Sequence, residues 1–303
     1  MTQALLTSWD FRLVVFICLV VPALLYVRGW RYLRKVTRSS HNGQRAHSRT
    51  DLAAGWKLAT YLGGLTTIAI SLMSPIDVLS GQLFFMHMTQ HLLLTMVAVP
   101  LMLIPNPFPV LVWGLPKRAR PRVSGLLSEH SRFRRLFAKV TSPGIVWLLY
   151  VCALIGWHDP ILYNLSLRNQ FVHDLQHLSF FLTTALLWWH ILGVAPRLHR
   201  TMTAGQRIIY TISVVPVSMI IGVVIAFAST PIYSHYVNVP RLMNLSVMQD
   251  QMIAGILMWI PGSEMFFWAA LIVLTRVAGA EARKPVHPAA PWLVDDNAAA
   301  SAQ

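Results

Sequence analysis

The chain alternates between long apolar stretches and short polar connections over its 303 residues. Seven of these stretches approach the roughly 20 residues that an α-helix needs to cross a bilayer. The regular alternation of apolar and polar residues that marks a membrane β-barrel is missing, so the pattern indicates helices. We therefore predict an all-α membrane protein, a seven-transmembrane-helix bundle, with spans at residues 11–27, 53–73, 83–104, 140–157, 175–194, 208–228 and 252–274.

The composition also indicates a membrane protein. Hydrophobic residues make up 55% of the chain and charged residues 12%, and the mean hydropathy is +0.54. These values exclude a soluble domain with a large core. The first apolar stretch is followed by basic residues and has no small-residue cleavage site, so we predict an uncleaved first span instead of a signal peptide.

The positive charges fall on one side of the predicted membrane. Four connecting segments hold 22 of the 25 Lys and Arg residues, namely 28–57, 117–139, 197–207 and 276–284. Only Arg12, Arg168 and Arg241 lie on the other side, so the positive-inside rule places the N-terminus outside and the C-terminus in the cytoplasm. We interpret the basic loops as orientation signals and contacts for anionic lipids, and expect no nucleic acid to bind. Residues 1–277 are predicted to form the membrane domain and residues 278–303 a disordered cytoplasmic tail.

Two pairs of histidines stand at the beginning of apolar stretches. His87 and His91 open the third stretch, and His173 and His177 open the fifth. Four residues are about one helical turn, so the two rings of a pair share one helix face, about 6 Å apart along the axis. Because both stretches enter from outside in the predicted topology, we expect four imidazoles to meet near the outer surface. Imidazole binds copper, zinc and haem iron, and ionisable groups at membrane depth are usually functional.

Further candidate residues are predicted on the same outer side. We predict a metal site with the ligands His87, His91, His158, His173 and His177, supported by Asp250, Met88 and Met252. Thioethers together with imidazoles suit copper, and we expect Asp250 to accept a hydrogen bond from a ligating imidazole. His235 in the last outer loop and His190 at the inner end of the fifth span are expected to serve elsewhere. Glu264, the one carboxylate deep in a span, is expected to face the bundle.

Histidines four residues apart on a helix also occur in zinc proteases. Such a protease needs Glu directly after the first His as its general base. Met88 and Asp174 occupy those positions here, and the sequence has no nucleophile elbow, phosphate loop or CxxC motif. We therefore predict that the protein is not an enzyme and has no catalytic residues.

Three segments combine these features in a fixed order. They are MHMTQHLLLTMVAVPLMLI, WHDPILYNLSLRNQFVHDLQHLSFFLTTALLWWHILG and DQMIAGILMWIPG. Together they resemble the CtaG family of cytochrome c oxidase assembly factors, the multi-span type of Gram-positive bacteria. The resemblance covers roughly residues 55–277, and it departs from the family pattern at Ala254 and Gly255, where a glycine pair is expected.

The resemblance implies a multi-pass protein of the cell membrane that matures a haem–copper oxidase by handling copper. It carries over to His87, His91, His158, His173, His177 and Asp250. The expected partners are haem–copper oxidase subunits, a copper chaperone and the lipid bilayer. Two alternatives stay open: a haem-binding electron-transfer protein, with histidines of two facing helices on the iron, and a transporter or assembly scaffold without metal.

Overall fold

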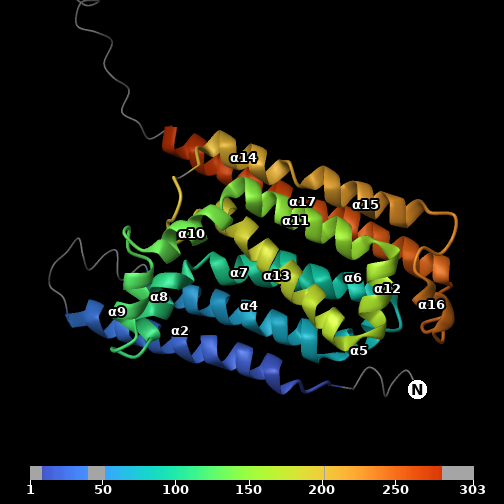
Figure 1. Ribbon diagram of the computed structural model, residues 1–303, viewed down its shortest axis with the longest axis horizontal. Coiled ribbons are helices and arrows are strands. Elements are labelled where there is room, and N and C mark those ends of the chain that lie inside the picture. The colour runs from blue at the N-terminus through green and yellow to red at the C-terminus, as the bar shows by residue number, and fades with distance from the viewer. Residues whose placement is uncertain (1–8, 40–51, 201, 282–303) are drawn as a thin grey trace, which may run out of the picture.

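The long helices lie side by side along the longest axis of the molecule (Figure 1). The computed structural model describes residues 9–39, 52–200 and 202–281, and within these ranges every element is helical. The predicted all-α class is thereby confirmed for the described part of the chain. Residues 282–303 of the predicted tail lie outside the described residues, and the last helix continues through Glu281, past the predicted end of the membrane domain.

The N-terminal half of the chain forms one side of the bundle (Figure 1). Its first elements are α2 (Leu13–Ser39), α4 (Gly55–Met73) and the short α5 (Pro75–Ser80). The next column is continuous but changes its winding, from α6 (Phe84–Leu92) through the π-helical turn η1 (Leu93–Ala98) to α7 (Val99–Leu103). Three short helices follow at one end of the molecule, α8 (Pro107–Gly114), α9 (Arg120–Leu126) and α10 (Arg132–Val140).

The C-terminal half completes the bundle. α11 (Pro143–His158) leads to the short α12 (Pro160–Arg168) at the opposite end, and α13 (Gln170–Leu192) returns through the middle. The last elements are α14 (Ala204–Ile212), α15 (Val215–Phe227), the short α16 (Ser234–Asn238) and the long α17 (Val247–Glu281).

Local sequence signals fix the ends of α12 and α13. The Asp159 carboxylate accepts hydrogen bonds from the backbone N–H groups of Ile161 and Leu162, and so begins α12 with Pro160 in its first turn. The Asn169 side chain caps α13 in the same way. α13 ends at Gly193, whose φ of +62° is a left-handed conformation that glycine adopts without strain.

Several helices are long and apolar enough to cross a membrane. Four stretches of the described chain meet this condition, Leu13–Thr37, Phe84–Leu103, Ala204–Phe227 and Val247–Thr275, and a fifth span results if α10 and α11, bent by 52°, count as one. The chain is therefore a multi-pass membrane protein. The predicted spans at 53–73 and 175–194 fold as the long helices α4 and α13, which are outside this set.

Buried polar residues explain why α13 is not among the candidate spans. His173, Gln176, His177 and Thr184 are all buried against neighbouring helices and do not face lipid. Mean hydropathy is calculated over all side chains of a helix, so polar side chains that are buried lower it as much as polar side chains that face the lipid. The helix can therefore lie in a membrane although its sequence is only moderately apolar.

Small residues let α15 and α17 approach closely. A Cβ atom added to Gly255 would lie 2.4 Å from the backbone nitrogen of Ala226, and one added to Gly222 would lie 2.8 Å from the nitrogen of Trp259. Close contact through small residues is typical of helix packing in membranes. Gly255 is thus the residue that needs to be glycine, and the neighbouring Ala254 is fully buried without disturbing the contact.

We predict that Gly255→Ala destabilises the protein by about 1–3 kcal/mol, because the added methyl group overpacks the α15–α17 contact. Thermal unfolding of the purified protein in detergent measures the effect. Gly156→Ala is the matched control, since a Cβ at Gly156 meets nothing within 4 Å. It should leave stability unchanged or raise it by roughly 0.5–1 kcal/mol. Equal behaviour of the two variants would contradict the close packing.

Candidate metal centre

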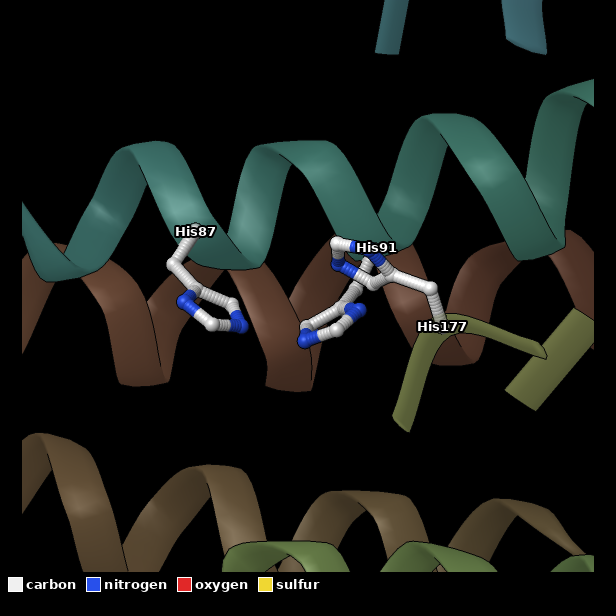
Figure 2. A group of neighbouring side chains, drawn as sticks. All are labelled: His87, His91 and His177. Carbon is white, nitrogen blue, oxygen red and sulfur yellow. The ribbon is translucent and has the colours of Figure 1, made fainter. Parts of the chain in front are cut away.

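The two histidine pairs meet between α6 and α13. Ring centroids are 4.4 Å apart for His87 and His91 and 4.2 Å apart for His173 and His177. Across the two helices, His91 lies 5.0 Å from His177, and His87 lies 5.2 Å from His173. Figure 2 shows the rings of His87, His91 and His177 turned into the same space. The predicted convergence of four imidazoles is thus present in the structure.

The imidazoles are buried, and most of their nitrogens have no hydrogen-bond partner among the described residues. All four rings belong to buried residues, and His87 is completely inaccessible. The atoms without a partner are His87 Nε2, His91 Nδ1 and Nε2, His173 Nε2 and His177 Nε2. His87 Nδ1 lies 3.4 Å from the Tyr236 hydroxyl. Each unsatisfied buried polar atom costs about 1–3 kcal/mol, so the cluster is expensive unless something binds to it.

Three of the histidines are placed to share one metal ion. One ligand nitrogen from each of His87, His91 and His177 lies within 4.8 Å of the other two. Metal–nitrogen bonds are about 2 Å long, so ligands of one ion stand roughly 3–4 Å apart. Ring rotations that move the nitrogens by on the order of 1 Å close this difference, which is within the range of a rotamer adjustment. The donor set therefore fits a metal that prefers imidazole.

A small cavity adjoins the cluster. Its volume is about 50 Å³, room for an ion or a few water-sized groups, and His91 and His158 both line it. His158 Nδ1 lies 2.7 Å from the Leu154 carbonyl oxygen, while Nε2 is buried without a partner among the described residues. His158 is thus beside the histidine cluster, as predicted, but outside the group of three whose nitrogens lie closest together.

Asp250 has a different contact from the predicted one. Its two carboxylate oxygens accept hydrogen bonds of 2.9 Å from the backbone N–H groups of Phe84 and Phe85. Among the described residues no histidine donates to it. Leu83 precedes α6 and has no side chain that can cap the helix, so Asp250 of α17 supplies the missing acceptors from a distant part of the chain. It positions the helix that carries His87 and His91.

The two methionines predicted near the site differ from each other. Met88 is buried and lines the cavity beside His91. Met252 is 43% exposed and lies on the outer face of α17, because the buried face of this helix runs through Ala254 and Met258. Met258 lines the cavity in its place.

The structure gives three other polar residues of the membrane domain contacts or positions outside the histidine cluster. His190 Nε2 contacts the Thr141 carbonyl oxygen at 2.8 Å, and the His190 ring is 5.2 Å from that of His199. His235 Nε2 contacts the Gly81 carbonyl oxygen at 2.9 Å. Both histidines are therefore engaged elsewhere, as predicted. Glu264 lies on the exposed face of α17, contrary to the expectation that it faces the bundle.

Gln90 and Gln176 were missed by the sequence analysis. Both are completely buried, and each directly precedes the second histidine of a pair, so both pairs share the pattern His-x-x-Gln-His. The Gln90 amide donates to the Ser71 carbonyl oxygen at 2.9 Å and to the Asp77 carboxylate at 2.6 Å. The repeated glutamine was a signal in the sequence that could have identified these residues.

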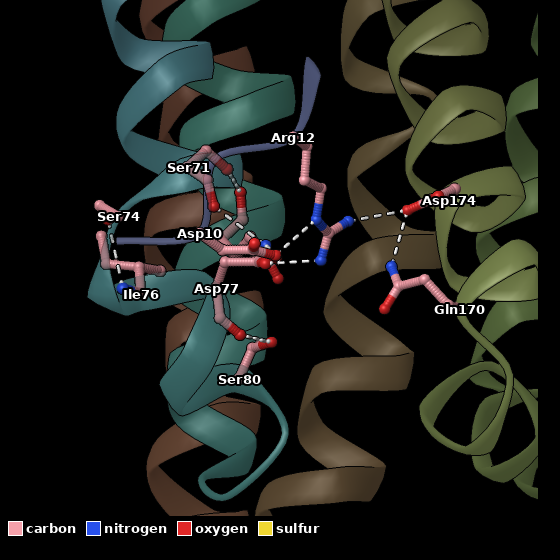
Figure 3. Close-up of polar contacts among 10 residues, drawn as sticks. Asp10, Arg12, Ser71, Ser74, Ile76, Asp77, Ser80, Gln170 and Asp174 are labelled. Atoms are coloured by element: carbon pink, nitrogen blue, oxygen red, sulfur yellow. Dashed lines mark hydrogen bonds and ion pairs between the residues drawn. The ribbon is translucent and has the colours of Figure 1, made fainter. Parts of the chain in front are cut away.

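Arg12 holds one edge of the site together (Figure 3). Its guanidinium forms ion pairs of 2.9 Å with Asp10, 2.7 Å with Asp77 and 2.9 Å with Asp174. Burial raises the pKa of the Asp77 carboxyl, while Arg12 and the Gln90 amide oppose this rise. The ion pairs tie the segment before α2 to α5 and to α13, where Asp174 follows His173 directly.

The sequence is similar to several known proteins. A family model described as cytochrome c oxidase caa3 assembly factor (Caa3_CtaG) matches residues 24–280. An uncharacterized protein of Mycobacterium bovis is 25% identical over 264 residues, which are 84% of this chain and 37% of the relative. An uncharacterized protein of Mycobacterium leprae is 21% identical over 261 residues, with the same coverage. The chain thus spans well under half the length of these relatives. No solved structure matches it.

We predict that Asp250→Ala loosens the first turn of α6, because it leaves two buried N–H groups without acceptors at about 1–3 kcal/mol each. Hydrogen exchange measures this directly, and the amides of Phe84 and Phe85 should lose protection by roughly tenfold or more. Asp159→Ala is the matched control, since it removes a helix cap at the surface and should affect α12 alone. Unchanged protection at Phe84 and Phe85 in the Asp250 variant would rule out the positioning role.

Proposed function

The chain belongs to the family of cytochrome c oxidase caa3 assembly factors, and we propose that it binds copper at the histidine cluster and delivers it to a haem–copper oxidase. The observation that carries this proposal is the group of three buried imidazoles whose ligand nitrogens lie within 4.8 Å of one another. His173 and His158 stand beside them and are proposed as further ligands during loading or release. Asp250 and Met88 support the site, the first through α6 and the second from the cavity wall.

Copper agrees better with the site than haem does. Imidazole ligates copper, zinc and haem iron alike, but thioethers next to imidazoles favour copper. A haem group needs a pocket of several hundred Å³, as other cofactor-sized ligands do. The cavity beside the cluster has about 50 Å³ and suits an ion. The haem-binding alternative would require the helices to separate.

The side chains of the site favour a carrier over an enzyme. The family is one of assembly factors, which supports a non-catalytic role. Neutral imidazoles and thioethers are exchangeable ligands, and they lack the redox-labile thiolate of a cysteine. Such a set can hold a metal and release it to a partner. We propose oxidase subunits as recipients and a copper chaperone as the donor.

The proposed topology is a seven-helix membrane domain. The seven columns are α2, α4, α6 to α7, α11, α13, α14 to α15 and α17, which lie side by side in Figure 1. The basic segments α9 and α10 gather at one end, and α5, α12 and α16 at the other. This arrangement supports an N-terminus outside and a C-terminus in the cytoplasm. The histidine cluster then faces the outer side of the cell membrane, where copper is handed over.

We predict that the double variant His91→Ala and His177→Ala inserts and folds but loses metal binding. It removes two of the three grouped ligands and leaves the apolar faces intact. Metal content after copper loading, measured on the purified protein by mass spectrometry, should fall by at least tenfold. His190→Ala with His199→Ala is the matched control, since this pair lies elsewhere and should retain full metal. Equal copper in both double variants would refute the proposed site.

In cells lacking the protein, we predict that oxidase polypeptides are made but contain too little copper. Complementation with the wild-type chain should restore oxidase activity and bound copper, whereas the His91 and His177 double variant should restore neither. Extra copper in the medium should rescue part of the activity. Full oxidase activity with the double variant would show that the histidines are not needed, and the scaffold alternative would then replace the carrier.

A further inference from the structure

The cavity beside the histidine cluster is lined by methionines as well as by histidines. Three methionines face it, Met88, Met96 and Met258, and all three are buried. They come from two helical columns, α6 with η1 and α17. Methionines in apolar helices usually pack against other hydrophobic side chains. These three pack in the hydrophobic core in this way, and they also line a cavity together with His91 and His158.

The π-helical turn η1 contributes to this lining. Thr95 and Met96 are consecutive residues, and both line the cavity together with His91 and Leu92. A π turn inserts one extra residue into a helix and frequently occurs at functional sites. The Thr95 hydroxyl donates to the His91 carbonyl oxygen at 2.6 Å, so it meets a backbone acceptor within the helix. The turn thus contributes a thioether to the same cavity that His91 lines.

A hydrogen bond to one ring nitrogen of His158 leaves its other ring nitrogen available as a ligand atom. The carbonyl of Leu154 accepts from Nδ1 at 2.7 Å, which places the proton on Nδ1 and the lone pair on Nε2. Nε2 is buried and has no partner among the described residues. Both nitrogens of His91 are likewise buried and without a partner among the described residues. A backbone hydrogen bond to one ring nitrogen is the arrangement that usually orients a metal-binding histidine.

The absence of charged groups from the described cavity lining favours a monovalent ion over a divalent one. The thioethers, imidazoles and hydroxyl groups around the cavity are all neutral, and no carboxylate lines it among the described residues. The cost of moving an ion from water into an apolar medium grows with the square of its charge, so a divalent ion costs about four times as much as a monovalent one. Thioethers are in addition the ligands that select Cu(I).

We propose that this cavity is a second metal site, specific for Cu(I), formed by Met88, Met96 and Met258 with His91 and His158. The proposal rests on the proposed copper function and adds an oxidation state and a second position to it. His91 belongs to both sites, so an ion can pass between the nitrogen-rich cluster and the sulfur-rich cavity by exchanging one ligand at a time. The sulfur-rich site lies deeper in the bundle than the cluster.

X-ray absorption of the purified full chain, loaded with Cu(I) under reducing conditions, tests the proposal. The copper in the wild-type protein should show sulfur neighbours in addition to nitrogen. The triple variant Met88→Leu, Met96→Leu and Met258→Leu should lose the sulfur signal and bind Cu(I) about tenfold more weakly or worse. Methionine to leucine conserves volume and costs less than about 1.5 kcal/mol per site, so the fold should persist. Zn(II) binding at the histidine cluster should remain.

A second triple variant is the matched control, with leucine at the exposed methionines Met219, Met243 and Met252. It should keep both the sulfur signal and the Cu(I) affinity. Wild-type protein that binds Cu(I) through nitrogen alone would overturn the methionine site and leave the histidine cluster standing, whatever the variants do. Wild-type protein that binds neither Cu(I) nor Zn(II) would overturn both proposals.

Discussion

Buried imidazole nitrogens need partners, and this requirement governs the rest of the structure. Five nitrogens of His87, His91, His173 and His177 have no partner among the described residues. At about 1–3 kcal/mol each, they would cost an amount comparable with the whole stability of many domains. A bound metal ion reduces this cost, because each ligating imidazole then gives the lone pair of one nitrogen to the metal. Under the proposed function, the protein holds unpaired buried nitrogens that its metal ion would satisfy.

The remaining polar contacts serve to keep the two helices of the cluster in place. Asp250 holds the first turn of α6 from α17, and Gln90 ties the same helix to Asp77 and to the backbone of Ser71. Arg12 connects Asp77 to Asp174, which follows the first histidine of α13. These contacts lie around the cluster and leave the imidazoles free. The proposed metal site is thus preorganised by groups that are not among its proposed ligands.

The sequence was sufficient to predict the helical class and the meeting of the histidine pairs, because helical spacing and predicted orientation depend on local patterns. It was insufficient for Asp250, whose hydrogen-bond partners are backbone groups of Phe84 and Phe85 in a distant segment. It also favoured Met252 over Met258. α17 is apolar on all sides, as a helix between lipid and protein can be, so its sequence does not reveal which face is buried. α13 presents the reverse case, with polar residues hidden inside the bundle.

The central claim is that several imidazoles bind one metal ion. Pulsed electron paramagnetic resonance of the Cu(II)-loaded protein tests it most directly, because each copper-bound imidazole couples the electron spin to its remote nitrogen. Our account predicts coupling to three or more histidine nitrogens in the wild-type chain, with fewer in His91→Ala. A spectrum with coupling to one histidine or none would contradict a shared site between α6 and α13.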